Sequence, residues 1–549
     1  MMPYTPHVLV ALVLSLCTPL VLRAQNPTTR PNIVVILADD MGFSDAGCYG
    51  GEIPTPNIDA LAAHGVRFTQ FYNNAWCCPS RASLLTGRFP HQVGIGTNID
   101  GYTKWMRDAA NSPAYGDQLT AGVPTMGDLM RAAGYHTMMI GKWHLGYRPD
   151  AWPARRGFDR SFALVGGAMN YWGSETDGKP AQMSLNGETF VPPKDGFFAT
   201  DAFTDRAVEF LNEAAKSATA KDGAAAKPFL MYLAYNAPHW PLHARPAEIE
   251  KHRGKYRKPW QAVREVRYER LRKLGVIDDR VALAPMERGN VKPWSELTDA
   301  ERDEWDLRMA VYAAMVEGLD AGVGRVMQTL RDAGVAENTL VLFVSDNGGA
   351  AEDPGRGPAS AATGTRDSFR GYARPWASVS NTPFFRNKVT VFEGGISAPM
   401  IAHWPAGIPK EKHGQFVREP AHLIDLLPSF LELAGAAPTD ESFKPEGQSI
   451  VPMMKGNSGN PDRTFAWEHD GHRGLRKGKW KIVRLPSDAQ WSLFDMEADR
   501  AEQNDLAAKQ PDVLREMVAA YDAWAKRCGV IPWEELEPKR PPAAAAQRG

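Results

Sequence analysis

Cysteine is scarce in this sequence, which has five cysteines among 549 residues. So few cysteines exclude a fold that is held together by a framework of disulfides. An excess of charge is also lacking, because the formal net charge is −1. The molecule as a whole therefore has no attraction to nucleic acid or to an anionic membrane. Any anion that the protein binds must be held by a local cluster of side chains.

Long apolar segments are lacking as well. The most apolar stretch runs from Val8 to Leu22, and it is too short and too interrupted by polar residues to span a bilayer comfortably. Arg23 and Ala24 follow it, and cleavage after Ala24 would make residues 1–24 a secretory signal peptide. We therefore expect an exported protein, periplasmic or secreted, without a stable membrane span. The alternative for this segment is an uncleaved anchor.

What the sequence does contain is an alternation of apolar runs and helical patterns. Four apolar runs are typical of strands buried on both faces of a parallel sheet. These runs are Asn32–Ala38, Tyr135–Ile140, Phe229–Ala234 and Leu340–Val344. Helical spacing precedes two of them, over Thr125–Ala133 and from Tyr312 to Leu330. The alternation predicts an α/β fold with a large, mainly parallel sheet covered by helices on both faces.

The length and a change of composition predict a second, smaller domain. A chain of 549 residues is too long for one simple core. Beyond a polar stretch near residue 440, two strand-like segments and one helical pattern follow, namely Gly474–Arg484, Gln490–Asp495 and Pro511–Cys528. We predict a large domain over 30–440, a small antiparallel sheet with a helix over 441–535, and a disordered tail over 536–549.

Polar residues follow each of the four predicted strands. They are Asp39 and Asp40, Lys142 and His144, His239, and Asp346 and Asn347. Ligands of open α/β sheets bind outside the carboxyl ends of the strands, so we expect these side chains along one edge. Each of them alone could be an ordinary turn or loop residue. The oxygen ligands Asp39, Asp40, Asp346 and Asn347 together predict a hard cation, calcium or magnesium, and not zinc.

A short motif around Cys77 has the features of an anion site. In Cys77-Cys78-Pro79-Ser80-Arg81, Pro79 suits the first turn of a helix, and Gly87 suits the left-handed residue that ends it. Cys77 is then expected just outside the helix N-terminus, where free N–H groups favour negative charge. Arg81 lies about one turn further on and can lean back towards Cys77. The alternative is a buried pair of cysteines that caps a core helix.

The complete motif, continued by Leu84-Leu85-Thr86-Gly87-Arg88, resembles the signature of the type I, formylglycine-dependent sulfatases, in particular the arylsulfatases. The resemblance covers most of the chain after Pro31 and includes Lys388 before Glu393-Gly394-Gly395. It implies an alkaline-phosphatase-like catalytic domain over 30–440 with a small C-terminal sheet and helix. The arginine often found soon after the two glycines is Ser397 here.

The resemblance also implies a modified residue, a metal and a catalytic set. Cys77 would be oxidised to formylglycine (3-oxoalanine) by a maturation enzyme, whereas Cys78 would not. One calcium ion is implied, with the ligands Asp39, Asp40, Cys77, Asp346 and Asn347. The catalytic residues implied are Cys77, Arg81, Lys142, His144, His239 and Lys388.

The implied reaction is hydrolysis of an aryl or carbohydrate sulfate ester through a covalent sulfo-enzyme intermediate. One hydroxyl of the hydrated aldehyde, acidified with the help of Arg81, attacks the sulfur. Lys142 and Lys388 bind the sulfate oxygens, and His239 binds the substrate and gives a proton to the leaving alcohol. His144 then takes a proton from the second hydroxyl, so that sulfate leaves and the aldehyde re-forms.

Two other functions stay open at this point. A phosphonate monoester or phosphodiester hydrolase of the same superfamily would use the same aldehyde and metal. A non-catalytic protein that binds sulfated glycans would keep Cys77 as a thiol, although the complete set of ligands and bases argues against it.

Two further segments lie outside these motifs. Residues 248–307 are rich in charge, and we expect their cluster of basic residues to form a solvated helix face and not an anion groove. This cluster consists of Arg264, Arg267, Arg270, Arg272 and Lys273. Residues 353–376 are rich in Gly, Pro, Ala and Arg, which predicts a long surface loop near the site.

Overall fold

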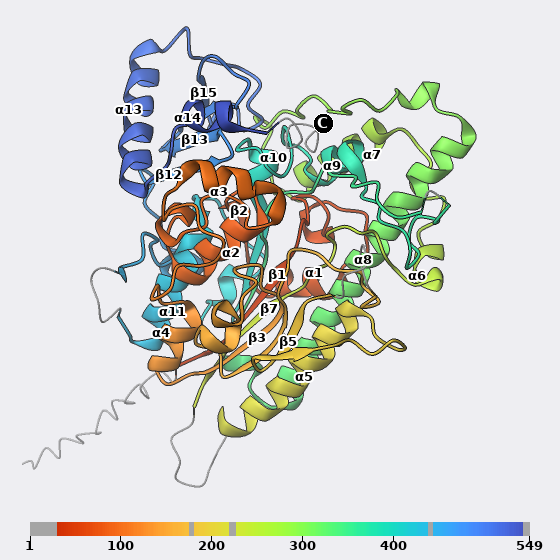
Figure 1. Cartoon of the computed structure of the whole chain (residues 1–549), viewed down its shortest axis with the longest axis vertical. Coiled ribbons are helices and arrows are strands. Elements are labelled where there is room, and N and C mark those ends of the chain that lie inside the picture. Colours follow the sequence, from red (N-terminus) through yellow and green to blue (C-terminus); the bar gives the residue numbers. More distant parts are fainter. Residues whose placement is uncertain (1–29, 175–180, 219–226, 359, 438–442, 542–549) are drawn as a thin grey trace, which may run out of the picture.

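The structure, a computed structural model, describes residues 30–174, 181–218, 227–358, 360–437 and 443–541. The predicted signal peptide, residues 1–24, lies outside the described residues. The described chain forms a large sheet with helices on both sides and a smaller sheet at one corner (Figure 1). Within these ranges no helix has both the length and the apolar character that a membrane crossing requires.

The large sheet has eleven strands in the order β10-β2-β9-β8-β1-β7-β3-β4-β5-β6, with β11 paired to β2. The four predicted runs form its parallel centre, as β1 (Asn32–Ala38), β3 (His136–Lys142), β7 (Phe229–Ala234) and β8 (Thr339–Ser345). The other strands are β2 (Val66–Tyr72), β4 (Arg160–Leu164), β5 (Met183–Leu185), β6 (Glu188–Phe190), β9 (Ser397–His403), β10 (Phe416–Val417) and β11 (Ala421–His422). The predicted mainly parallel sheet is therefore confirmed at its centre, while β9, β5 and β6 pair antiparallel.

Helices cover both faces because alternate residues of a strand point to opposite sides. Val34 and Ile36 of β1 lie in one apolar cluster with α5 (Ala199–Ala218) and α8 (Asp299–Asp332). Ile33, Val35 and Leu37 of β1 lie in another, on the side of α2 (Cys77–Thr86), α4 (Met126–Ala132) and α11 (Leu426–Ala434). Further helices are α1 (Pro56–Ala63), α3 (Lys104–Ala110), α6 (Pro246–Glu250), α7 (Trp260–Lys273), α9 (Ala373–Ser380), α10 (Glu393–Ile396) and α12 (Val451–Met454).

The C-terminal region forms the small antiparallel sheet that the sequence predicts. Its strands are β12 (Thr464–His469), β13 (His472–Lys477), β14 (Trp480–Arg484) and β15 (Ser492–Asp495). Helix α13 (Pro511–Cys528) packs on one face, and Phe465 and Trp467 on the other face contact Tyr72 and Val391 of the large domain. The small sheet is thus packed between its own helix and the large domain.

The first residues of the predicted disordered tail, 536–549, are folded. Leu536 is the last residue of α14 (Trp533–Leu536), and Glu537–Lys539 forms a 3-10 turn. Trp533 and Leu536 are buried against Met106 and Tyr115, which explains why this part is folded. The remainder of the predicted tail, from 542 onward, lies outside the described residues.

The basic cluster on α7 is not a solvated face throughout, so that prediction is wrong for two of its residues. Arg264 and Arg267 are both 0% exposed. Arg267 pairs with Asp45 at 2.7 Å and with Glu52 at 2.8 Å, and Arg264 donates to the Ala284 carbonyl at 2.7 Å. The two arginines lie three residues apart on the inward face of the helix, where these acceptors compensate their burial. The other three basic residues, Arg270, Arg272 and Lys273, are exposed.

The predicted surface loop over 353–376 is also shorter than expected at its end. Helix α9 begins at Ala373, and its Trp376 is 0% exposed.

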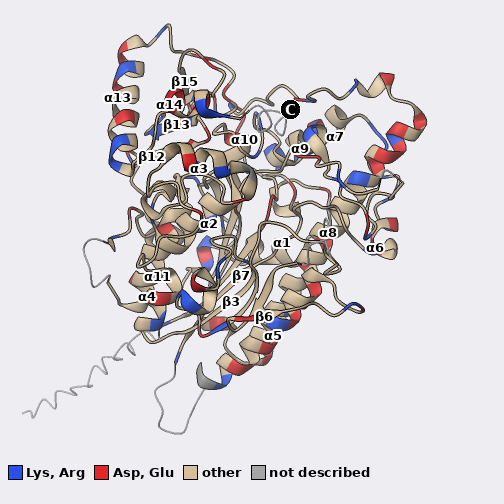
Figure 2. Ribbon diagram, viewed as in Figure 1, with Lys and Arg blue, Asp and Glu red and all other residues tan. Residues whose placement is uncertain are grey.

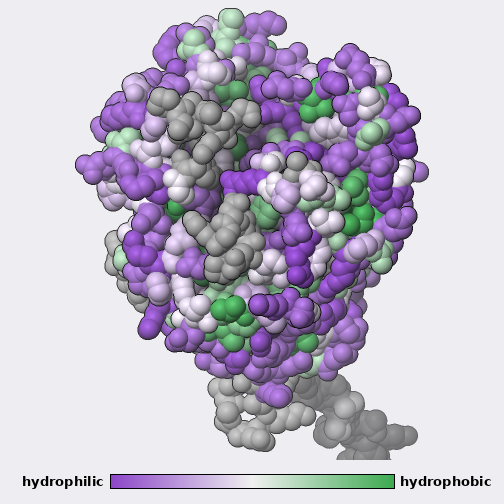
Figure 3. Space-filling model, turned by 45° about the vertical axis from the view of Figure 1, so that its right-hand side comes forward, coloured by the Kyte–Doolittle hydropathy of each residue, from purple (hydrophilic) through white to green (hydrophobic). Residues whose placement is uncertain are grey.

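The charged residues of the outer helices α5 and α13 are of both signs, as expected from the balanced composition (Figure 2). Hydrophilic residues cover most of the face seen in Figure 3, and the hydrophobic ones lie in small separate groups.

Candidate active site

Cys77 is the first residue of α2 and is 2% exposed. The sequence placed it just outside this helix, but Trp76 holds the N-cap position instead. Gly87 ends the helix with a φ of 67°, in the left-handed region, as predicted. Residue 77 therefore lies in the first turn, where backbone N–H groups without helical partners favour an anion.

The carboxyl ends of β8, β1, β7 and β3 bring the other predicted residues together, because these strands are neighbours in the sheet and run parallel. Asp39 and Asp40 follow β1, Asp346 follows β8, and Lys142 is the last residue of β3. Lys388 joins them from the segment before α10 through its contact with Asp40. All ten predicted site residues are buried, and they are Asp39, Asp40, Cys77, Arg81, Lys142, His144, His239, Asp346, Asn347 and Lys388.

Three carboxylates and three cationic side chains form pairs in this interior. The pairs are Lys142 Nζ with Asp39 Oδ2 at 2.7 Å, Lys388 Nζ with Asp40 Oδ1 at 2.9 Å, and Arg81 Nη2 with Asp346 Oδ2 at 2.7 Å. A buried charge is strongly unfavourable unless a partner compensates it, and here each charge has one. The formal charges of these six side chains cancel.

The acidic end of this cluster fits a divalent cation. Asp39, Asp40 and His239 each offer an atom, and these atoms lie within 4.8 Å of one another. Asp39 Oδ1 and Asn347 Oδ1 are buried without a hydrogen-bond donor. Buried oxygens without donors suit a hard cation such as calcium or magnesium.

Both carboxylate oxygens of Asp346, a predicted metal ligand, already accept hydrogen bonds. Its Oδ2 accepts hydrogen bonds from Arg81, and its Oδ1 accepts one from the backbone N–H of Asp40 at 3.2 Å. Asn347 donates its amide N–H to Asp40 Oδ1 at 2.6 Å. Asp346 and Asn347 thus both contact Asp40. His239 is an additional candidate ligand that the predicted set did not include.

The cluster shifts the pKa values of its members. Burial opposes the ionisation of Asp40, but Lys388 and His239 outweigh it and lower the pKa of Asp40 to about 2. Burial together with the charge of Asp39 raises the pKa of Asp346 to about 6. Burial holds the pKa of His239 well below its usual value, and the nearby Lys142 and Lys388 lower it further.

The tautomer of His239 follows from its neighbours. Its Nδ1 lies 2.6 Å from the Trp240 carbonyl oxygen, which can only accept, so Nδ1 carries the hydrogen. In the neutral ring Nε2 is then the acceptor, and it lies 3.5 Å from Asp40 Oδ2. His239 therefore presents Nε2 to the cluster.

His144 contacts the cysteine directly. Its Nδ1 lies 3.4 Å from Sγ of Cys77, and its Nε2 lies 3.2 Å from Oδ1 of Asp100. The backbone of His144 is in the left-handed region, with a φ of 54°. Asp100 was not predicted, because the loop that carries it shows no motif.

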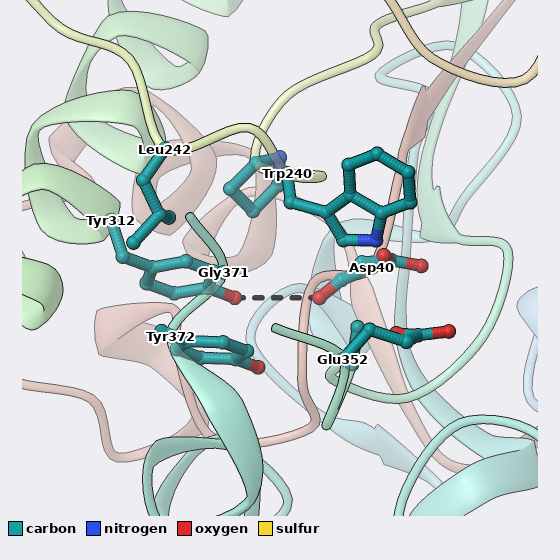
Figure 4. A pocket seen from close by; sticks show the side chains of 9 residues that line it. Asp40, Trp240, Leu242, Tyr312, Glu352, Gly371 and Tyr372 are labelled. Atoms are coloured by element: carbon teal, nitrogen blue, oxygen red, sulfur yellow. Dashed lines mark hydrogen bonds between the residues drawn. The ribbon is translucent and has the colours of Figure 1, made fainter. Parts of the chain in front are cut away.

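Glu352 is a second residue that sequence reasoning missed. It lines a small cavity beside Asp40, together with Trp240, Tyr312 and Tyr372 (Figure 4). Its Oε1 lies 3.7 Å from Nζ of Lys388. No sequence signal marks Glu352, which lies in a stretch of small residues shortly after Asp346.

Comparisons with known proteins identify the family. Residues 31–436 match the family described as sulfatase. The chain belongs to the sulfatase family. Residues 383–520 also match the family described as N-sulphoglucosamine sulphohydrolase, C-terminal. The chain is therefore a sulfuric ester hydrolase.

Relatives of this sulfatase cover most of its length. The arylsulfatase of Klebsiella aerogenes is 34% identical over 445 residues, which cover 77% of this chain and 90% of that protein. The N-acetylgalactosamine-6-sulfatase of Canis lupus familiaris is 30% identical over 493 residues, which cover 86% and 75%. The crystal structure of Ps i-CgsB in complex with k-i-k-neocarrahexaose is 26% identical, with a TM-score of 0.68, and the match covers 95% of this chain and 100% of that one. The fold is thus the alkaline-phosphatase-like fold of sulfatases.

Proposed function

We propose that this sulfatase hydrolyses an aryl or carbohydrate sulfate monoester to alcohol and inorganic sulfate, with a formylglycine made from Cys77 as its nucleophile. The observation that carries the proposal is the contact of Cys77 with His144 in a buried site that contains three cationic side chains. A sulfate monoester requires charge neutralisation, a strong nucleophile and a proton for the leaving oxygen. The residues of this site can supply all three.

In the proposed reaction one hydroxyl of the hydrated aldehyde attacks the sulfur, and the bond from sulfur to the leaving alcohol breaks. His239 protonates the leaving oxygen. Burial, and after it the charges of Lys142 and Lys388, lower the pKa of His239 in the free protein. We propose that the sulfate group of the substrate offsets the charges of the two lysines and so raises the pKa of His239. Protonated His239 is then available when the substrate is bound.

The second half of the proposed reaction releases sulfate. His144, with Nδ1 next to residue 77, takes the proton of the remaining hydroxyl. The carbon–oxygen bond to sulfate breaks, and the aldehyde re-forms. A serine at residue 77 could accept sulfate but has no second hydroxyl with which to expel it.

We propose that Asp39, Asp40, Asp346, Asn347 and residue 77 hold one calcium ion. The ion would supply positive charge beside Asp39 and Asp40. In this structure the carboxylates of these two residues pair with lysines. Lys142 and Lys388 would then be available to bind the sulfate oxygens, in keeping with their burial beside Cys77.

The relatives support a carbohydrate sulfate as the substrate class to test first. One of them is named as an N-acetylgalactosamine-6-sulfatase, and another was solved with a neocarrahexaose. We also propose that the protein is exported and that a formylglycine-generating enzyme matures it. Because Cys77 is 2% exposed, we infer that maturation acts before the chain has folded.

The test uses protein produced with and without a formylglycine-generating enzyme. We expect the residue 77 peptide to have the mass of formylglycine and to react with an aldehyde probe. Sulfate release should follow the aldehyde content on para-nitrophenyl sulfate and on a panel of sulfated sugars, and should exceed hydrolysis of a phosphodiester. Cys77→Ser should lose multiple turnover, whereas Cys78→Ala keeps the motif and should retain it. Active protein with an unmodified Cys77 would contradict the proposal.

A further inference from the structure

Asp100 contacts the residue that we propose for the release of sulfate. Its Oδ1 lies 3.2 Å from Nε2 of His144 and also accepts a hydrogen bond from the hydroxyl of Tyr147. The side chain of Asp100 is 27% exposed, whereas that of His144 is 1% exposed. Asp100 thus lies between the buried histidine and the surface.

The protonation state of Asp100 decides which nitrogen of His144 carries a hydrogen. Burial opposes ionisation of Asp100, but His144 and Tyr147 outweigh it and hold its pKa below the usual range. An ionised carboxylate only accepts hydrogen bonds, so Nε2 of His144 must be the donor. Neutral His144 then has its lone pair on Nδ1, which is the nitrogen that faces residue 77.

The ring of His144 has little room to turn. A Cβ atom added to Gly167 would lie 2.6 Å from Cε1 and 2.8 Å from Nε2 of His144. The backbone N–H of His144 donates to the Val165 carbonyl at 3.1 Å, and its φ of 54° is unusual for a residue other than glycine. The ring is therefore held by packing on one side and by Asp100 at Nε2.

We propose that Asp100 is a positioning residue for the release of sulfate: it fixes the Nε2–H tautomer of His144 and stabilises the imidazolium that forms. In this step Nδ1 takes the proton of the second hydroxyl, the C–O bond to sulfate breaks, and the C=O bond of the aldehyde forms. The proton then passes from His144 to water. The inference rests on the proposed formylglycine reaction. To that reaction it adds Asp100, a residue that acts through His144.

The experiment compares Asp100→Asn with the parent, both matured to formylglycine. An asparagine amide can donate to Nε2 and so favours the wrong tautomer, with little change in shape. With para-nitrophenyl sulfate in excess, we expect an initial burst of nitrophenol before a slow steady state, and we expect kcat/KM to change little. The steady-state kcat should fall by about 10–100-fold, the usual effect of losing a residue that orients a functional side chain. Sulfated residue 77 peptide should accumulate and be detected by mass.

Four further variants sharpen the test. His144→Ala should accumulate the same sulfated peptide, and the double variant with Asp100→Asn should be no slower than His144→Ala alone, because Asp100 acts through His144. Gly167→Ala should have the same phenotype, since its methyl group displaces the ring without changing a charge. Asp108→Asn is the matched control, because Asp108 is 60% exposed and pairs with Lys104.

The outcomes separate this inference from the function on which it rests. A parent that releases no sulfate, or a His144→Ala variant that forms no sulfated residue 77 peptide, overturns the proposed function and this inference with it. A normal parent with an Asp100→Asn variant that turns over at the parental rate overturns the inference alone. The same holds if the variant shows no burst and its kcat/KM falls in parallel with kcat, or if the double variant shows the product of the two single effects.

Discussion

Nζ of Lys481 lies 2.8 Å from Oε1 of Glu502, and both side chains are 0% exposed. The same ammonium lies 3.0 Å from Glu393, the first residue of α10 in the large domain. Arg500 donates to Glu393 at 3.1 Å and to Ser397 at 2.9 Å. The C-terminal region thus supplies an arginine beside Ser397, the position where the family often has an arginine of its own.

We expect Lys481→Met to destabilise the protein by about 3–5 kcal/mol, because it leaves buried carboxylates without their partner. The matched control is Lys479→Met on the same hairpin. Lys479 is 43% exposed and pairs with Asp495, so its loss should change the free energy of unfolding by about 0–1 kcal/mol. Urea unfolding of both variants measures this difference, and equal effects would contradict it.

Stability should also depend on the protonation of Glu502. Burial raises the pKa of Glu502 from 4.5 to about 7, against the opposing effect of Lys481. The folded state then binds this proton more tightly than the unfolded state. The free energy of unfolding therefore falls as the pH rises from 4.5 to about 7. The change is on the order of 3 kcal/mol.

Glu502→Gln should remove this pH dependence, because glutamine does not titrate. The measurement is urea unfolding across the same pH interval. Glu516→Gln serves as the control, since Glu516 is 69% exposed, and it should leave the dependence as it is in the parent. A parent whose free energy of unfolding is constant or rises over this pH interval would contradict the prediction.

His239→Ala should slow the reaction most for poor leaving groups. An alkoxide from a sugar needs a proton as it leaves, and the loss of a general acid typically costs about 10²–10⁴-fold in rate. Nitrophenolate leaves without one, so kcat/KM for para-nitrophenyl sulfate should fall much less. His64→Ala, at an exposed position, should change neither rate. Equal losses on both substrates would show that His239 is not the proton donor.

Removal of divalent metal should abolish activity and lower Tm, since an ion that binds the site of the folded protein, and not the unfolded chain, stabilises the folded state. Calcium should restore both, and zinc should not, because the site offers mainly oxygen ligands. Asp40→Asn should no longer gain Tm from calcium, whereas Asp117→Asn, at an exposed ion pair with Arg148, should respond like the parent. Full activity in a metal-free preparation would contradict the metal site.

Much of the site follows from the sequence alone because its residues lie at the ends of regular elements. An apolar run followed by Asp39, and another followed by Asp346, place both carboxylates at one edge once the strands pair in parallel. The motif that begins at Cys77 identified the family without any structure, and Gly87 marked the end of its helix. These predictions depend only on local periodicity and turn chemistry.

Contacts between charges that are distant in sequence were decided only by the tertiary structure. The charge pattern of α7 predicted solvent exposure for Arg267, but Asp45 and Glu52 meet it in the interior. The contact of Asp100 with His144 joins a loop without a motif to the end of a strand. Periodicity determines which residues share a face of an element, whereas the partner of a buried charge depends on how all the elements pack, because only that packing supplies the compensating group.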